Sequence, residues 1–459
     1  MGREVQSSSL ASAAHRALPL GEHHSAPTIA GTRVPWRVTH HGDLHRTRVR
    51  GVNPWSSGRS HPLRRLAGLA LVLAVVVSCG TTSPDPSTAT PDPAGTSTAP
   101  ATTSSSPGGS TPPGPSAPVN VYAAAGANML DPLVASLPPR VYVPNSDSNT
   151  VTVIDPTTFK VVTTYPTGKG PQHVVPAHDL KSLWVNNDGA NTLTQIDPVT
   201  NRPTRSVPTA QPYNLYWTPD GQYGIVMAEA AQQMTFLDAT TMKKKFALTT
   251  DCKGLNHLDF SADGRYALVS CEFAGTVIKV DMTTHTQVGT LALGPASNMP
   301  QDVRLAPDGS SFYVADMMAG GVWVIDGATF TQTGFISTGI GAHGIYFDRP
   351  AHRMFVTNRG SNQVYGKPHG PGSISVLDWA TRTVTTTWTI PGGGSPDMGN
   401  LSPDGTQLWL SGRFDNEVYA LNTTTGALLA RIPAGPAPHG LTYWPQPGHY
   451  SLGHTGIMR

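Results

Sequence analysis

Cysteine, charge and long apolar runs are all scarce in this chain of 459 residues. It has three cysteines, and only 13% of its residues are charged. No Cys-x-x-Cys-His motif is present, which excludes covalently attached haem. The chain also lacks a Gly-x-Ser-x-Gly nucleophile elbow, a local His-Glu-x-x-His motif and a glycine-rich phosphate loop between a strand and a helix. These absences exclude several enzyme classes that are recognised by local motifs.

The one long apolar run spans residues 66–78, after Arg64 and Arg65, and ends at Cys79. It is too short for a membrane span of about 20 residues, and its basic, apolar and small-residue order is typical of a secretory signal. Its last residues, Val76-Val77-Ser78-Cys79, resemble the lipobox of bacterial lipoproteins, in which the cysteine becomes the acylated first residue. The alternative is a signal-anchor helix that ends in cysteine. We predict a signal peptide over residues 52–79 and lipidation of Cys79.

The rest of the chain divides by composition. Residues 1–51 precede the signal, and we expect them to be disordered or to lie upstream of the true translation start. Residues 80–118 are almost wholly Gly, Ser, Thr, Pro and Ala, which predicts a disordered linker. The predicted folded domain covers 119–447, followed by a C-terminal tail at 448–459. This order predicts an extracytoplasmic monomer, anchored by Cys79 to the outer face of the cytoplasmic membrane.

Charge and cysteine pairing are consistent with that location. The whole chain has 31 basic and 29 acidic residues, but ten of the arginines and only three acidic residues lie in 1–65. The remainder is mildly acidic, with a formal charge of −5, and gives no support for a nucleic-acid partner. If Cys79 is lipidated, Cys252 and Cys271 remain as a pair. An oxidising compartment favours a disulfide between them over two buried free thiols.

A repeat dominates residues 140–445. An apolar strand that ends in Asp or Asn recurs every 41–45 residues, with one longer interval, and its seven copies end at Asp155, Asp197, Asp238, Asp281, Asp326, Asp378 and Asn422. A shorter apolar strand precedes each copy, and a Thr-rich turn with a β-branched strand follows it. Turns such as Ser402-Pro403-Asp404-Gly405 separate the first and second strands of a unit. Four short strands in each such unit predict an all-β, seven-bladed β-propeller.

These units resemble YVTN-type β-propeller repeats, best in Val356-Thr357-Asn358 with the strand at residues 373–378. The first unit begins at its second strand, near Arg140. The unpaired strand at residues 439–444 is therefore predicted to complete the first blade from the C-terminal side. This closure would tie both ends of the domain together and remove open sheet edges.

Aligning the innermost strands predicts a polar ring at one end of the central channel. The aligned position holds, in order, His173, Tyr213, Asn256, Gln301, His343, Asp397 and His439, and the next position includes Asn214, His257 and Asp302. Arg304 follows on one of these strands. Loops after the second strands open on the same face and carry Glu229, Glu272, Asp316, Arg359 and Arg413, among others. We expect a funnel of imidazole, carboxylate, amide and guanidinium groups.

Three interpretations of this funnel compete. It can be polar lining that makes the propeller a binding or scaffolding module for a small molecule or a cell-envelope protein. It can hold Zn²⁺ or Cu²⁺ on His173, His257, His343 and His439 with Asp302 and Asp397, as part of a metal- or cofactor-dependent oxidoreductase. Enzymes of similar fold, including nitrous oxide reductase and haem d1 nitrite reductases, use channel histidines. Finally, sugar lactonases resemble YVTN propellers, which would make His257 a base beside Glu272 or Arg304.

Overall fold

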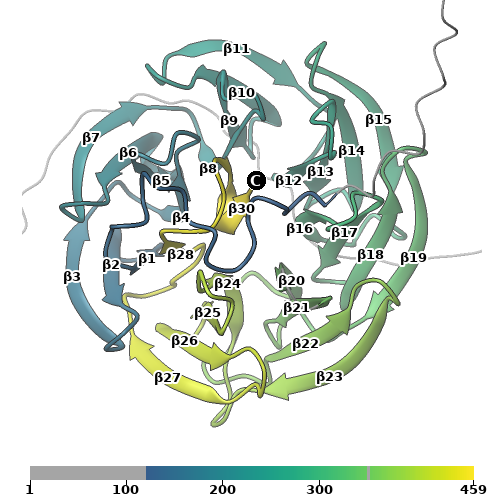
Figure 1. The fold of residues 1–459 in the computed structure, drawn as a ribbon. Helices are drawn as coiled ribbons and strands as arrows, with labels where there is room; N and C mark the ends of the chain where they lie inside the picture. The colour runs from purple at the N-terminus through teal and green to yellow at the C-terminus, as the bar shows by residue number, and fades with distance from the viewer. Residues whose placement is uncertain (1–119, 349–351) are drawn as a thin grey trace, which may run out of the picture. The chain divides into compact units, whose positions relative to one another are not determined.

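The computed structural model describes residues 120–348 and 352–459, and its sheets form a ring of seven blades (Figure 1). Each blade has four antiparallel strands in order from the channel to the rim, and one blade gains two further strands. Within the described part of the chain, the only helical elements are two short 3-10 helices, η1 (Asp188–Ala190) and η2 (His454–Gly456). The prediction of an all-β, seven-bladed propeller is confirmed.

The innermost strand of each blade lines the channel, and the second strand pairs with it on the outer side. In blades 1 to 7 the innermost strands are β28 (Thr442–Trp444), β4 (Pro171–Pro176), β8 (Pro212–Trp217), β12 (Leu255–Phe260), β16 (Pro300–Leu305), β20 (Ala342–Asp348) and β24 (Pro396–Leu401). The second strands are β1 (Arg140–Asn145), β5 (Leu183–Asn187), β9 (Tyr223–Ala228), β13 (Tyr266–Cys271), β17 (Ser311–Asp316), β21 (Arg353–Asn358) and β25 (Gln407–Gly412).

The third strands are the Asp- or Asn-terminated repeat, and the outer strands form the rim. The third strands are β2 (Thr150–Asp155), β6 (Thr192–Asp197), β10 (Gln233–Asp238), β14 (Thr276–Asp281), β18 (Gly321–Asp326), β22 (Ser373–Asp378) and β26 (Glu417–Asn422). The outer strands are β3 (Lys160–Pro166), β7 (Arg202–Pro208), β11 (Lys244–Thr249), β15 (Thr286–Ala292), β19 (Thr331–Ser337), β23 (Thr383–Thr389) and β27 (Leu428–Pro433).

The recurring acidic residue has a local structural role. In blade 4, Asp281 Oδ1 accepts hydrogen bonds from the backbone N–H groups of Thr283 and Thr284, both at 2.8 Å. Equivalent bonds occur at the other Asp or Asn positions of the repeat. A side-chain oxygen that holds its own following turn starts the reversal into the outer strand, which explains the repeat.

The strand β28 closes the ring as predicted. It pairs antiparallel with β1, with Tyr443 opposite Val141. Side chains of blades 1 and 7 form one buried cluster across this junction, including Val143, Trp409 and Val418. The junction between the two ends of the propeller is therefore sealed by strand pairing and by apolar packing.

Residues 448–459, expected as a tail after the propeller, are folded into its centre. β29 (Ser451–Gly453) pairs with β8 of blade 3, placing Gly453 opposite Tyr216, and β30 (Ile457–Met458) pairs with β29. Figure 1 shows β30 in the middle of the ring. Ile457 and Met458 are fully buried. We call residues 448–459 the central segment.

Residues 120–139 cross the face that carries the turns between first and second strands, which we call the turn face. Val121 N–H donates to Pro307 O in blade 5, and Asn128 N–H donates to Pro403 O in blade 7. Leu130 forms a parallel bridge with Gly448 of the central segment. Both segments therefore cover the turn-face end of the channel.

Cys252 and Cys271 form a disulfide in blade 4. The predicted signal peptide, Cys79 and the linker lie outside the described residues. Within the described ranges, the structure contains no helix of the length and apolarity that crossing a membrane requires.

Candidate functional site

The end of the channel opposite the turn face opens into a cleft of about 220 Å³, which we call the funnel. Many of the predicted funnel residues meet there. The lining residues are Gln172, Asp188, Tyr213, Glu229, Glu272, Phe273, Gln301, His343, Arg359, Val364, Tyr365, Arg413 and His439. They come from the starts of innermost strands and from the loops after second strands, as the alignment predicted.

Charge in the funnel is separated by sign. Glu229 and Glu272 follow the second strands of blades 3 and 4, whereas Arg359 and Arg413 follow those of blades 6 and 7. In a ring of seven, these two pairs of blades lie on opposite sides of the channel. The funnel therefore has an acidic wall facing a basic wall.

Asp397 is the centre of a buried ion-pair network. Its Oδ1 lies 2.7 Å from Nε of Arg359 and 3.2 Å from Nδ1 of His343. Its Oδ2 lies 2.6 Å from Nδ1 of His439. Burial alone would raise the pKa of Asp397, but Arg359 and the two histidines hold it well below its ordinary value. Burial lowers the pKa of His439 to about 4, so His439 is neutral and donates its Nδ1 proton to an ionised Asp397.

Both carboxyl groups of the acidic wall have raised pKa values. Burial and the neighbouring Glu272 carboxylate raise the pKa of Glu229 to about 8, and burial also raises the pKa of Glu272. Asn256, which is buried behind the wall, donates from Nδ2 to Glu272 Oε2 at 2.8 Å and to Gln301 Oε1 at 3.1 Å. At neutral pH Glu229 is therefore largely protonated.

Arg413 on the basic wall bonds to neutral acceptors. Its Nη1 donates to Ser146 Oγ at 3.0 Å and to Ala437 O at 3.1 Å. No carboxylate among the described residues lies within ion-pair distance of this guanidinium, and burial lowers the pKa of Arg413. Arg359 is neutralised by Asp397, so the net positive charge of the basic wall belongs to Arg413.

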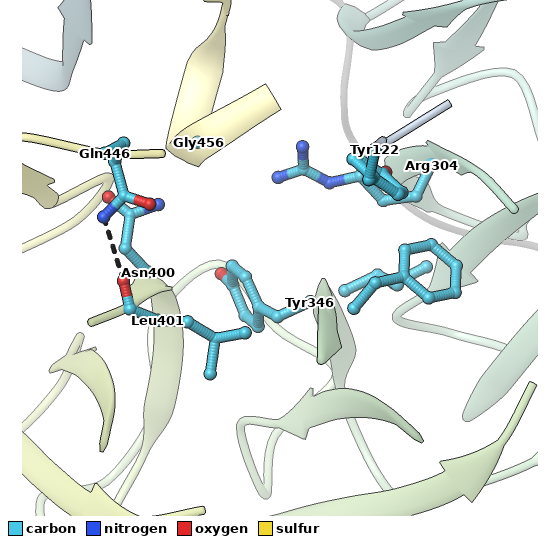
Figure 2. A pocket seen from close by; sticks show the side chains of 9 residues that line it. Tyr122, Arg304, Tyr346, Asn400, Leu401, Gln446 and Gly456 are labelled. Atoms are coloured by element: carbon cyan, nitrogen blue, oxygen red, sulfur yellow. Dashed lines mark hydrogen bonds between the residues drawn. The ribbon is translucent and has the colours of Figure 1, made fainter. Parts of the chain in front are cut away.

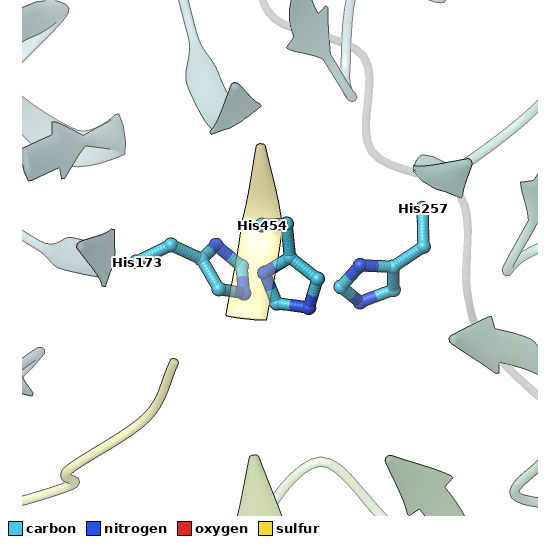
Figure 3. A group of neighbouring side chains, drawn as sticks. All are labelled: His173, His257 and His454. Carbon is cyan, nitrogen blue, oxygen red and sulfur yellow. The ribbon is translucent and has the colours of Figure 1, made fainter. Parts of the chain in front are cut away.

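Beneath the funnel lies a cluster of histidines. His173 (β4), His257 (β12) and His454 (η2) are fully buried, and their candidate ligand nitrogens all lie within 4.8 Å of one another. Figure 3 shows the His454 ring between the other two, and each of those rings lies 4.4 Å from it, centroid to centroid. The His173 ring also contacts Tyr213 and His439 of the funnel, at 5.3 and 4.9 Å between centroids. Burial lowers the pKa of all three imidazoles, which are therefore neutral.

Asp302, Arg304 and Asp316 do not line the funnel, contrary to expectation. Asp302 Oδ2 lies 3.1 Å from Arg304 Nε and accepts the N–H of Ile345, so this pair joins blades 5 and 6 below the ring. Asp316 Oδ1 accepts N–H groups of its own loop, including Met318 at 3.1 Å and Ala319 at 2.9 Å. These carboxylates are used within the fold. The expected metal set also changes, because Asp397 is paired and His454 joins His173 and His257.

The turn-face end of the channel offers little space. Figure 2 shows the cavity there, bounded by Tyr122, Arg304, Tyr346 and Gln446, whose Nε2 donates to Leu401 O at 2.9 Å. Its volume of about 30 Å³ holds little more than a water molecule. Of these two cavities in the channel, the funnel therefore has the larger space for a ligand.

Comparison with known proteins agrees with this architecture. The sequence matches the YNCE-like beta-propeller family over residues 117–446. The chain belongs to this family. No curated protein matches the sequence.

Solved structures similar to this YNCE-like propeller are distant in sequence. A functionally unknown protein from Desulfotomaculum acetoxidans is 14% identical, with a TM-score of 0.54 over 66% of this chain and 98% of that one. A putative 6-phosphogluconolactonase from Bacteroides uniformis is 16% identical, with a TM-score of 0.52 over 67% of this chain and 99% of that one. At these identities the likenesses show the fold alone.

Proposed function

We propose that this YNCE-like propeller is an extracytoplasmic binding protein whose funnel holds a small zwitterion. The observation that carries the proposal is the separation of charge across one cleft. Glu229 and Glu272 face Arg359 and Arg413 from opposite blades. A ligand with an ammonium group at one end and a carboxylate at the other complements both walls at once.

Arg413 is the expected partner of the ligand's carboxylate, because its present acceptors are neutral. A guanidinium binds a carboxylate through two parallel hydrogen bonds. The Glu229–Glu272 pair is the expected partner of the ammonium group. The cleft of about 220 Å³ is smaller than the roughly 300–1,000 Å³ of pockets for drug-sized molecules, which favours a ligand of amino-acid size.

Calorimetric titration with α-amino acids tests this function. Each amino acid is compared with its amide, which lacks the carboxylate, and its N-acetyl derivative, which lacks the ammonium group. We expect both analogues to bind at least about 10-fold more weakly, since a hydrogen bond to a charged group contributes about 1.5–3 kcal/mol. Equal binding of the three compounds, or binding of none, would overturn the proposal.

Two variants connect the affinity to the two walls. Arg413→Gln and Glu272→Gln each remove one charge of the funnel and should each weaken binding of the zwitterion. Arg265→Gln is the matched control, because this side chain is 80% exposed and contacts Asp263 in a turn on the turn face. A similar loss in all three variants would point away from the funnel.

The location is the second part of the proposal. The lipobox-like sequence before Cys79 supports acylation of Cys79, and the linker at 80–118 supports a flexible tether of the propeller to the outer face of the membrane. Metabolic labelling with an alkyne fatty acid should mark the wild type and leave Cys79→Ser unlabelled. Labelling of the Cys79→Ser variant would contradict an anchor at this residue.

A further inference from the structure

The three buried histidines below the funnel have unsatisfied ring nitrogens. Nε2 of His173, Nε2 of His257 and both nitrogens of His454 have no hydrogen-bond partner within the described structure. All three side chains are fully buried. A buried polar atom without a partner costs free energy, and the large majority of such atoms in native proteins are satisfied. Several unsatisfied nitrogens directed into one small space indicate a group that would satisfy them together.

We propose that His173, His257 and His454 form a buried three-histidine metal site for copper or zinc, completed by the central segment. The inference goes beyond zwitterion binding and does not depend on it. Two nitrogens bound to one ion at the roughly 2.0–2.1 Å of a metal–imidazole bond lie at most about 4.2 Å apart, so ligand nitrogens within 4.8 Å of one another need shifts of about an ångström or less to bind one ion. Zn²⁺ with three histidines retains an open fourth position.

The hydrogen bond of His173 leaves the required nitrogen free. Its Nδ1 lies 2.9 Å from the backbone carbonyl oxygen of Tyr213, an acceptor only. The ring proton is therefore on Nδ1, and Nε2 presents a lone pair to the cluster. Gly440 allows this position, because a Cβ atom there would collide with Cδ2 of the His173 ring.

The hydrogen bonds of His257 bear on the tautomer that can bind a metal ion. His257 Nδ1 lies 2.9 Å from the Asn214 side-chain amide nitrogen and 3.2 Å from Tyr216 Oη. Asn214 Oδ1 accepts the N–H of Leu215 at 2.9 Å, so the amide nitrogen faces His257 Nδ1 and favours the tautomer with the ring proton on Nε2. Binding of a metal through Nε2 requires the other tautomer, in which Tyr216 Oη is the acceptor for the Nδ1 proton. Three imidazoles without a thiolate suit copper and zinc, and copper(II) is expected to bind more tightly than zinc.

The third ligand depends on the central segment. His454 follows Gly453, which pairs with Tyr216 of β8, and precedes the buried Ile457 and Met458. Arg459 Nη2 lies 3.0 Å from Asp259 Oδ1 of β12, which ties the end of this segment to the blade that carries His257. Two blades and the central segment therefore each supply one ligand.

The test is metal binding by the full-length chain, with Cu²⁺ and Zn²⁺ added separately. Stoichiometry is measured by elemental mass spectrometry after dialysis, and affinity by competition with a chromophoric chelator. We expect one ion per chain. Each of His173→Gln, His257→Gln and His454→Gln should lower the affinity more than about 100-fold, beyond the cost of losing an outer-shell partner.

His449→Gln is the matched control, since its side chain is in the same segment, 65% exposed, and pairs with Asp131. It should leave metal affinity unchanged. A folded wild-type chain that binds neither ion more tightly than about 10 μM would overturn the proposal, and so would full affinity in His454→Gln. If a variant fails to fold, electron paramagnetic resonance of the Cu²⁺-loaded wild type tests the site without any substitution. Coupling to three imidazole nitrogens supports the site, and coupling to fewer overturns it.

Discussion

Asp397 accepts the Nδ1 proton of His439 at 2.6 Å, and this hydrogen bond joins the innermost strand of blade 7 to the residues that lead into the closing strand of blade 1. The same carboxylate holds Arg359 on the basic wall of the funnel. One buried side chain thus connects closure of the ring to the geometry of the candidate binding site.

Replacing Asp397 with Asn should destabilise the fold strongly. The amide preserves the shape of the side chain but leaves the buried Arg359 guanidinium without a counter-charge. Removing one partner of a buried pair costs about 3–5 kcal/mol. Guanidinium denaturation of the wild type and Asp397→Asn measures this difference in the free energy of unfolding.

The same pair of proteins gives a pH test. Because the pKa of Asp397 in the folded state lies below its ordinary value of 3.8, its stabilisation is fully present above that pH. It is lost as the pH falls through the lower value of the folded state. The stability difference between wild type and Asp397→Asn should therefore shrink in acid, and a constant difference would contradict the ion-pair role.

Affinity for a zwitterion should depend on pH through Glu229. The pKa of Glu229 is about 8 in the free protein, raised by burial, Glu272 and Asp188. An ammonium group favours ionised carboxylates, so binding below this pH releases a proton. Affinity should rise from about pH 6 to about pH 8 and then level off.

Calorimetry in two buffers of different ionisation enthalpy counts the released proton. Glu229→Gln cannot release it and should show a flatter pH profile. An unchanged profile in this variant would assign the proton to another group.

The disulfide between Cys252 and Cys271 should stabilise blade 4 and the acidic wall together. The cysteines are 19 residues apart, and closing a loop of this size contributes about 3 kcal/mol in the chain-entropy treatment. Cys252→Ser/Cys271→Ser should lose about that much stability in chemical denaturation. Reductant should lower the free energy of unfolding of the wild type by a similar amount and leave that of the double variant unchanged. Because Cys271 directly precedes Glu272, the double variant should also bind the zwitterion more weakly.

Packing of the central segment can be tested without metal. Ile457 is fully buried, and truncating such a side chain costs about 2–5 kcal/mol. Ile457→Ala should therefore lower the free energy of unfolding by that amount. Ile340→Ala is the control, because Ile340 is 60% exposed and a surface substitution changes stability by about 0.5 kcal/mol or less. Equal effects would show that the segment contributes no packing.

The blades could be predicted from the sequence because each repeat contains the residue that holds its own turn. Asp281 and its equivalents hold the turn into the outer strand, so the period of the fold is visible without tertiary information. The closing strand could be predicted because the first repeat lacks an innermost strand and one unpaired strand follows the last repeat. The charged residues of the funnel could be placed because they occupy equivalent loop positions.

The deviations from the predicted site have different causes. Asp302 is held by Arg304 on its own strand and by the N–H of Ile345 in the next blade, and the alignment of the strands does not reveal such partners. Asp316 is engaged by its own loop. His454 was missed because the central segment has no repeat to align. Leu452, Ile457 and Met458, with no charge before Arg459, were the one available indication that this segment is buried.

The central segment occupies the turn-face half of the channel, where a cavity of about 30 Å³ remains, so the funnel of about 220 Å³ is the wider end of the channel. Tyr213 and His439 line the funnel and contact the His173 ring beneath it, so they lie between the funnel and the three histidines. A metal ion at the proposed three-histidine site would therefore bind before the funnel ligand. A bound funnel ligand would slow dissociation of the ion.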